Sequence, residues 1–195
     1  MKRYFQYTKN RDSKETDLRK EIKHRWWILV IIALTGFLLD WWTKSYAVKH
    51  FTLGQPASVI GDYLQFVLLY NKAALFGLDP RHLIPGFPVN LVFSIFTSIA
   101  IIALIAYYNY LKKTEILMHL GLAMVLPGAI GNLFDRLLYP GRGVVDFIMV
   151  DLKVWPFNPW PVFNIADAYV TIGVGILFIS ILFEEQHRKN KKVAA

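Results

Sequence analysis

Two aspartates of this chain have the residue type and the setting to carry out hydrolysis. Asp146 lies in the segment GVVDF (143–147) and Asp167 in the segment FNIAD (163–167). Because they flank a short polar break between two long apolar segments, we expect both at the same edge of a lipid bilayer. Two carboxylates held close together cannot both ionise easily, so one keeps its proton while the other is charged. Such a pair supplies an acid and a base, and it can cleave an amide without a metal, thiol or cofactor.

The composition indicates a membrane protein. Of the 195 residues 55% are hydrophobic, and the mean hydropathy is +0.36. A soluble domain of this size could not bury so much apolar surface. The chain has no Cys, which excludes disulfides, thiolate metal sites and a Cys nucleophile. Its five His show no metal-ligand spacing, and Ser94 and Ser98 have no obvious base, so a metallopeptidase and a Ser-Lys enzyme are disfavoured.

The net charge of +8 comes from clusters that flank the apolar segments. Nine Lys/Arg precede Trp26, and four more lie within 188–192. Such clusters are typical of topology signals and of contacts with anionic lipid, so we predict membrane lipid and no nucleic acid as a partner. A cleavable signal peptide ending near 45–47 is the alternative for the N-terminus. The charged region is too long for one, and Asp40, Trp41 and Trp42 fit poorly before a cleavage site.

Four segments approach the roughly 20 apolar residues that cross a bilayer, namely 26–46, 88–111, 115–139 and 163–183. We therefore predict an all-α membrane protein with four transmembrane helices and outer loops at 47–87 and 140–162. Residues 1–25 form a charged tail, helical from about Thr16, and 184–195 form a basic tail.

The distribution of basic residues predicts the orientation. An even number of spans places both termini on one side, where the tails and the turn between the second and third spans hold 15 Lys/Arg, against five in the other two loops. The positive-inside bias puts both termini in the cytoplasm. This orientation gathers the unusual polar residues of the chain at the outer leaflet: Asp40, Lys44, Asn71, Asn132, Asp135, Arg136, Asp146, Asn164 and Asp167.

The first outer loop is long for a connection, which usually means function or independent structure. Residues 58–67 predict a β-hairpin with a two-residue turn at Gly61 and Asp62. Both faces of its second strand are apolar. The hairpin either rests on the bilayer or caps a lipid-filled cleft, or it is a plain structural hairpin.

Several polar residues have helical spacing. Asn132, Asp135 and Arg136 share one face of the third span, where an ion pair and an amide would tie helices together. We expect Arg136 to orient the site or to neutralise Asp135. Gly121, Gly128 and Gly131 lie near that face and would let a neighbouring helix approach.

Asn164 precedes Asp167 at i, i+3, which predicts that the two share an inward face. Asp40 and Lys44 are an i, i+4 pair that is either an interfacial ion pair or faces the substrate.

Two loop residues have simpler alternatives. The Asn71 amide either holds a peptide backbone or closes a turn. Asp151 shares the loop of Asp146, but Lys153 and solvent could satisfy it.

These segments together resemble the lipoprotein signal peptidases, the type II bacterial signal peptidases that act as membrane aspartic proteases. The resemblance runs from Asp40 to Asp167 through five short motifs in order: DWWTK (40–44), NKAALFG (71–77), GAIGNLFDR (128–136), VVDF (144–147) and FNIAD (163–167). One departure is Ala73, where the family usually has Gly.

The resemblance implies that Asp146 and Asp167 are the catalytic pair. It implies that the other motif residues support the site or the substrate: Asp40, Lys44, Asn71, Asn132, Arg136 and Asn164. The implied substrate is a prolipoprotein whose Cys carries diacylglycerol, cleaved without a cofactor at the outer leaflet of the bacterial cytoplasmic (inner) membrane. An oligomer is not implied.

Two other functional classes are compatible with acids inside a membrane protein. A proton- or ion-coupled transporter is disfavoured, because the acids gather at one leaflet and no inverted repeat is visible. A non-catalytic lipopeptide-binding protein would bind a precursor without turnover.

Overall fold

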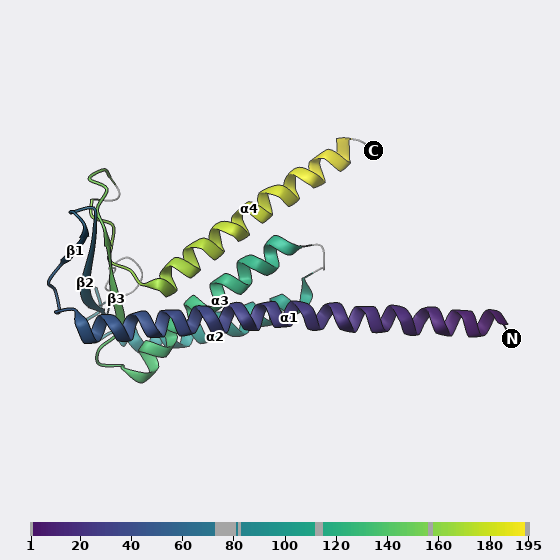
Figure 1. The fold of residues 1–195 in the computed structure, drawn as a ribbon, viewed down its shortest axis with the longest axis horizontal. Coiled ribbons are helices and arrows are strands. Elements are labelled where there is room, and N and C mark those ends of the chain that lie inside the picture. The colour runs from purple at the N-terminus through teal and green to yellow at the C-terminus, as the bar shows by residue number, and fades with distance from the viewer. Residues whose placement is uncertain (1, 73–80, 82, 112–114, 156–157, 194–195) are drawn as a thin grey trace.

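The computed structural model describes residues 2–72, 81, 83–111, 115–155 and 158–193. Figure 1 shows helices running along one another and a small sheet at the end of the bundle far from both chain termini. The elements in chain order are α1 (Lys2–His50), β1 (Ala57–Ile60), β2 (Leu64–Asn71), α2 (Val89–Tyr110), α3 (Ile116–Leu138), β3 (Val144–Val150) and α4 (Ile165–Val193).

Four helical segments are long and apolar enough to cross a membrane, as predicted: Arg25–His50, Val89–Tyr110, Ile116–Leu138 and Ile165–Glu184. Helices suit this setting because they satisfy their backbone hydrogen bonds internally where no water is available. Large apolar side chains cover the outside of the bundle. Phe96 and Ile102 are each 68% exposed and Phe178 is 62% exposed, which suits contact with lipid.

Helix α1 is longer than predicted. The sequence indicates helix from about Thr16, whereas α1 begins at Lys2 and continues without a break into the first span. Residues 2–25 contain neither Gly nor Pro and are rich in good helix formers. Figure 1 shows this part of α1 extending beyond the other helices.

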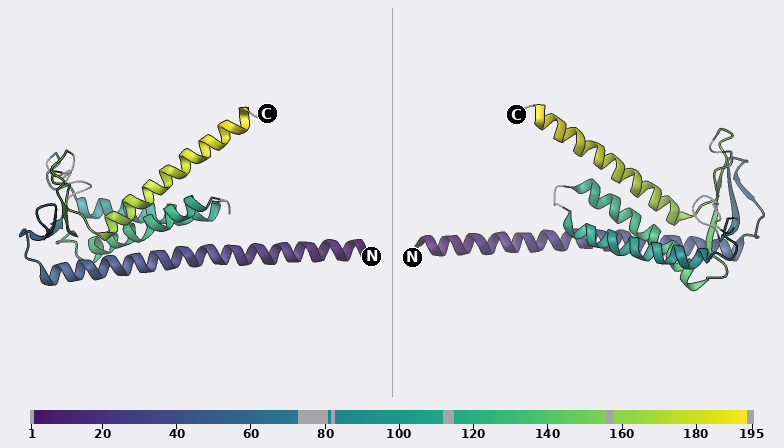
Figure 2. Two further views of the ribbon diagram at one scale, coloured as in Figure 1. Left: turned by 45° about the horizontal axis from the view of Figure 1, so that its top comes forward. Right: turned by 180° about the vertical axis from the view of Figure 1, so that it is seen from behind.

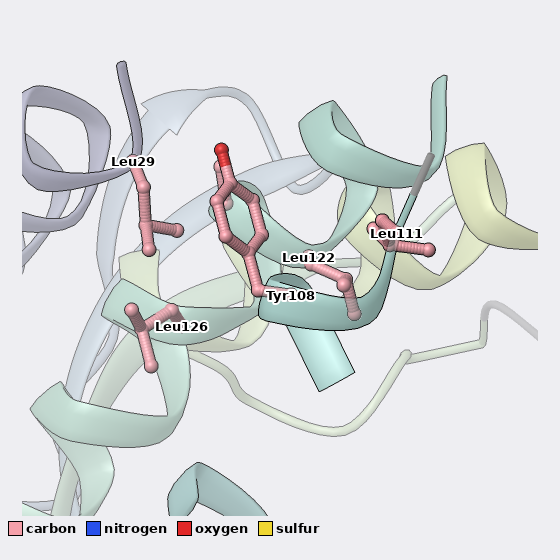
Figure 3. Close-up of a cluster of buried hydrophobic side chains, with 6 residues drawn as sticks. Leu29, Tyr108, Leu111, Leu122 and Leu126 are labelled. Carbon is pink, nitrogen blue, oxygen red and sulfur yellow. The ribbon is translucent and has the colours of Figure 1, made fainter. Parts of the chain in front are cut away.

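Helix α3 lies in the middle of the bundle and packs against α1, α2 and α4. An apolar cluster joins three of these helices through Leu29, Tyr108, Leu111, Leu122, Ala123 and Leu126 (Figure 3). The predicted close approach at the glycines of α3 is confirmed. A Cβ at Gly121 would lie 2.7 Å from the Leu177 side chain, and one at Gly128 would overlap the carbonyl oxygen of Ala166.

The sheet has three antiparallel strands in the order β1-β2-β3. The predicted hairpin is present, but its turn has three residues instead of two, because Ile60 pairs with Leu64. Gly61 takes a left-handed conformation (φ +52°), and the Tyr63 N–H donates to the Ile60 carbonyl. The third strand, β3, is a finding that the sequence did not predict.

The sheet lies at the end of the helix bundle far from the two chain termini, as both views in Figure 2 show. An apolar cluster of Ala47, Leu68, Val145 and Phe147, with Ile165 packed against it, holds the sheet to α1 and to the start of α4. This packing places Asp146 on β3 beside the first turn of α4.

Candidate active site

The two candidate catalytic carboxylates come from different elements and meet at Asn164. The Asn164 Nδ2 donates to Asp146 Oδ1 at 2.7 Å, and the Asn164 backbone N–H donates to Asp167 Oδ2 at 3.1 Å. Asn164 itself is fully buried. One rigid residue therefore holds an oxygen of each carboxylate.

Asn164 and Asp167 also form the N-cap of α4. The Asn164 Oδ1 accepts from the Asp167 backbone N–H at 2.9 Å, and the Asp167 Oδ2 accepts from the Asn164 backbone N–H at 3.1 Å. This reciprocal arrangement is a capping box, which satisfies two backbone donors at a helix start. The i, i+3 spacing that the sequence shows is therefore a helix-start signal as well as a functional one.

Asp146 is 3% exposed and is held from two sides. The Asn71 Nδ2 donates to its Oδ2 at 3.0 Å, opposite the bond from Asn164. Burial raises the pKa of Asp146 to about 7; the nearby charge of Asp167 adds to the rise, and the two amide donors and Lys44 oppose it. A group with this pKa is partly protonated at neutral pH, which suits a proton donor.

Asn132 connects the second carboxylate to α3. Its Nδ2 donates to Asp167 Oδ1 at 2.8 Å, and its Oδ1 accepts from Lys44 Nζ at 3.0 Å and from Asn164 Nδ2 at 3.2 Å. The Lys44 ammonium can only donate hydrogen bonds, so the Asn132 side-chain oxygen must face Lys44. The Asn132 side-chain nitrogen therefore faces Asp167.

Asp40, Lys44 and Asp135 form a buried charged triad beneath the two carboxylates. Lys44 Nζ lies 2.8 Å from Asp40 Oδ2 and 3.2 Å from Asp135 Oδ2, and none of the three side chains is more than 7% exposed. The predicted i, i+4 ion pair of Asp40 and Lys44 is therefore present, but it is buried inside the protein.

The triad carboxylates also bind backbone. The Ala166 N–H donates to Asp40 at 2.8 Å, and the Val145 N–H donates to Asp135 at 3.1 Å. These bonds fix the residues next to Asp146 and Asp167. At Gly131 the approach is so close that a Cβ would overlap the Asp40 carboxylate.

Arg136 forms no ion pair with Asp135, but the charges of Asp146, Asp167 and Asp135 all act on its guanidinium. Within the described residues Arg136 forms no ion pair; its Nη1 lies 3.5 Å from the Asn132 carbonyl oxygen, and its guanidinium lies over the Phe93 ring. The cations beside Asp135 are Lys44 and Arg142, with Arg142 Nη2 at 3.6 Å. Sequence reasoning missed Arg142 because it lies in a loop with no fixed spacing to Asp135.

The remaining predicted residues fall into two groups. The Asn71 amide donates to Asp146, a contact that the sequence did not predict. Asp151 pairs with Lys153 at 2.7 Å, as predicted, and this hydrogen bond lowers its pKa. Residue 73 lies outside the described residues. Among those that are described, no three His, Asp or Glu side chains are arranged to hold a metal ion.

Comparison with known proteins identifies the family of this chain. The family model described as "Signal peptidase (SPase) II" matches residues 32–183. The lipoprotein signal peptidase of Halalkalibacterium halodurans is 36% identical over 168 residues, covering 86% of this chain and 99% of that protein. The lipoprotein signal peptidase of Clostridium tetani is 35% identical, covering 83% of this chain and 97% of that protein.

Solved structures are similar as well. One described as a bacterial membrane enzyme at 2.3 Å resolution superposes with a TM-score of 0.70 at 28% identity, covering 82% of this chain and 90% of the other. A second, at 1.9 Å, gives a TM-score of 0.64 at 30% identity. The match extends over nearly the whole membrane region and includes the segments that carry Asp146 and Asp167. The chain therefore belongs to the signal peptidase II family of membrane proteases.

Proposed function

We propose that Asp146 and Asp167 are the catalytic dyad of a lipoprotein signal peptidase, an aspartic endopeptidase that removes the signal peptide from prolipoproteins. The bond cleaved is the one on the N-terminal side of a diacylglyceryl-modified Cys. The observation that carries the proposal is the shared contact of both carboxylates with the buried Asn164. Family membership supports a peptidase over the transporter and the non-catalytic binding protein that the sequence left open.

We assign the acid role to Asp146, because burial raises its pKa to about 7 and a fraction of it therefore holds a proton at neutral pH. Asp167 then acts as the base. Asp167 takes a proton from a water molecule, whose oxygen attacks the scissile carbonyl carbon, while Asp146 gives its proton to the carbonyl oxygen. The resulting gem-diol returns a proton to Asp146, Asp167 protonates the leaving nitrogen, and the C–N bond breaks. Both carboxyl groups are then back in their starting states.

The supporting residues hold the carboxylates of Asp146 and Asp167 in position. Asn71 and Asn164 bind the two oxygens of Asp146, and Asn132 binds Asp167 under the control of Lys44. Each of these donors is itself held by a strand, a helix cap or a buried ion pair. Little reorganisation is then needed when charge moves between the two carboxylates during the reaction.

We place the protein in the bacterial cytoplasmic membrane with both termini in the cytoplasm and the dyad at the outer leaflet. The excess of Lys/Arg on the side of the termini supports this orientation. Figure 1 is consistent with it, since the sheet with Asp146 lies at the opposite end of the bundle from the termini. A diacylglyceryl Cys anchored in the outer leaflet would bring its peptide bond to the depth of the dyad.

Two synthetic precursors test the proposal, one with a diacylglyceryl Cys and one with an unmodified Cys. The purified protein in detergent should cleave the first on the N-terminal side of the Cys and leave the second largely intact, as read by mass spectrometry of the products. Equal cleavage of both, or cleavage at another bond, would contradict the proposed specificity.

A further inference from the structure

Arg142 is a largely buried cation that the proposed reaction does not use. It lies in the loop between α3 and β3, four residues before Asp146. Its side chain is 24% exposed, and its Nη2 lies 3.6 Å from Asp135 Oδ1. Lys44 Nζ already lies 3.2 Å from the other oxygen of Asp135. Asp135 therefore has a cation beside each of its oxygens, although one cation would balance its charge.

The guanidinium of Arg142 also contacts two aromatic rings from different elements. Its Cζ lies 3.8 Å from the centre of the Tyr139 ring, at the C-cap of α3, and 5.5 Å from the centre of the Tyr70 ring on β2. Both distances are within the range of a cation–π contact. A guanidinium suits this position because it is planar and can stack on a ring while it also pairs with a carboxylate. Arg142 thereby joins the end of α3 to β2.

Tyr70 leads directly to one of the donors that hold Asp146. In the antiparallel pairing of β2 with β3, Tyr70 lies opposite Val145 and Asn71 lies opposite Val144. Asn71 is the last residue of β2, and its Nδ2 donates to Asp146 Oδ2 at 3.0 Å. Because a strand end has ladder neighbours on one side only, the position of Asn71 depends on how firmly Tyr70 is held.

Asp135 leads to Asp146 by a second route. Its Oδ2 accepts from the Val145 backbone N–H at 3.1 Å, and Val145 directly precedes Asp146. The turn that carries Arg142 is itself fixed to α3, because the Arg142 backbone N–H donates to the Tyr139 carbonyl at 2.9 Å. One side chain thus contacts a residue on each of the two routes by which Asp146 is held, one from β2 and one from α3.

We propose that Arg142 is a positioning residue of the dyad, which keeps the Asn71 amide on Asp146. It does so through its contacts with Tyr70 and Asp135. This role rests on the proposed function, since it assigns Asp146 to the reaction. The planar shape of the guanidinium matters as well as its charge: Arg142→Lys would keep a cation beside Asp135 but would lose the stacking on the rings.

The infrared band of the protonated Asp146 carboxyl group tests the proposal without a substrate. In the full chain in detergent, the band is identified by its absence in Asp146→Asn, and its loss is followed as pH rises. The hydrogen bond from Asn71 lowers the pKa of Asp146. A weakened bond in Arg142→Lys should therefore move the midpoint of this titration upward by about half a pH unit.

Two features of the design separate positioning from a simple effect of charge. Arg142→Lys keeps the positive charge, so a shift of the midpoint does not come from its loss. The other charged groups that interact with Asp146 are also kept, namely Asp167, Lys44 and Arg136. In the Asn71→Ala background Arg142→Lys should cause no further shift, because the amide through which it acts is gone.

Cleavage of the diacylglyceryl precursor gives a second readout. Arg142→Lys should lower kcat about tenfold and leave KM nearly unchanged, because the reacting carboxyl group is displaced and the substrate contacts are not. Lys49→Arg, the reverse exchange at an exposed position of α1, is the matched control and should change neither kcat nor the midpoint.

Thermal unfolding of each variant checks that the fold is kept. Should Arg142→Lys not fold, Tyr70→Leu removes the ring from the other side of the contact and should give the same upward shift. An unchanged midpoint, or an equal shift in the Asn71→Ala background, would overturn the positioning role. Failure of the wild type to cleave the precursor would instead contradict the proposed function, and the infrared titration would still decide the role of Arg142.

Discussion

Asn164 and Asp167 hold each other across the first turn of α4: the Asn164 side chain accepts from the Asp167 backbone, and the Asp167 side chain accepts from the Asn164 backbone. The same Asn164 amide donates to Asp146. A helix cap thus connects the two candidate catalytic carboxylates, so that forming α4 also assembles the site.

This double role can be separated by substitution. Asn164→Ala should lose both the cap and the donor to Asp146, lowering the free energy of unfolding by about 1 kcal/mol and activity by about 100-fold or more. Asn164→Ser should recover stability, because Ser is also a good cap, while activity stays low. Thermal unfolding and precursor cleavage measure the two effects. Full activity in Asn164→Ser would show that the amide donor is not needed.

The pH dependence of cleavage should have an alkaline limb set by Asp146. Activity requires Asp146 to hold its proton, so it should fall as pH rises through about 7. The hydrogen bond from Asn71 lowers the pKa of Asp146, so Asn71→Ala should move the alkaline limb to higher pH. A pH–rate profile of both proteins checks this. A limb that stays in place or moves to lower pH in the variant would contradict the assignment.

The same pKa predicts how stability varies with pH. Since burial raises the pKa of Asp146 from 3.8 to about 7, the folded protein binds the proton more tightly than the unfolded chain does. The stabilisation from this proton is complete below about pH 4 and is lost as pH rises through 7. Unfolding temperatures measured from pH 5 to 8 should therefore fall in the wild type more steeply than in Asp146→Asn. Parallel curves would be inconsistent with a raised pKa.

Lys44 is predicted to be essential for the fold and for the orientation of Asn132. Lys44→Met leaves the buried carboxylates of Asp40 and Asp135 without their shared cation, which should cost about 3–5 kcal/mol. Adding Asp40→Asn should restore part of the stability but not the activity, because nothing then fixes the Asn132 amide. Lys49→Met, at an exposed position five residues further along α1, is the control. Recovery of activity together with stability would argue against a positioning role.

The close packing of α3 on α4 makes a further prediction. Gly128→Ala would place a Cβ against the Ala166 carbonyl and within 2.6 Å of Val170, so the helices must separate. We expect a loss of about 1–3 kcal/mol and impaired cleavage, because Ala166 lies between Asn164 and Asp167. Gly175→Ala, with no atom within 4 Å of its Cβ, should be neutral or stabilising. Equal effects at the two positions would show that packing at Gly128 is not limiting.

The sequence was sufficient for the parts of the fold set by local pattern. The four apolar segments predicted the spans, because length and hydropathy alone decide whether a helix can cross a bilayer. From the order of the spans and their predicted orientation, we predicted that the motif residues around Asn164 lie at the same end of the bundle. The i, i+3 spacing of Asn164 and Asp167 is the spacing that a capping box requires.

The rest depends on long-range contacts that no local pattern encodes. Asp146 interrupts an apolar run, so the sequence predicted a loop where the structure has β3. The segment is a strand because it pairs with β2, with Leu69 opposite Asp146. Likewise the partners of Asp135 come from α1 and from a loop, and only the packed structure selects Arg142 over the neighbouring Arg136.

The most direct test of the dyad is cleavage of a diacylglyceryl precursor by Asp146→Asn and Asp167→Asn in detergent, beside the wild type and Asp151→Asn. Asp151 follows directly after β3 but pairs with Lys153, so its variant controls for loss of a carboxylate. We predict that Asp146→Asn and Asp167→Asn each lose at least about 1,000-fold in rate while keeping the wild-type fold, and that Asp151→Asn stays active. Near wild-type cleavage by either dyad variant would contradict the account.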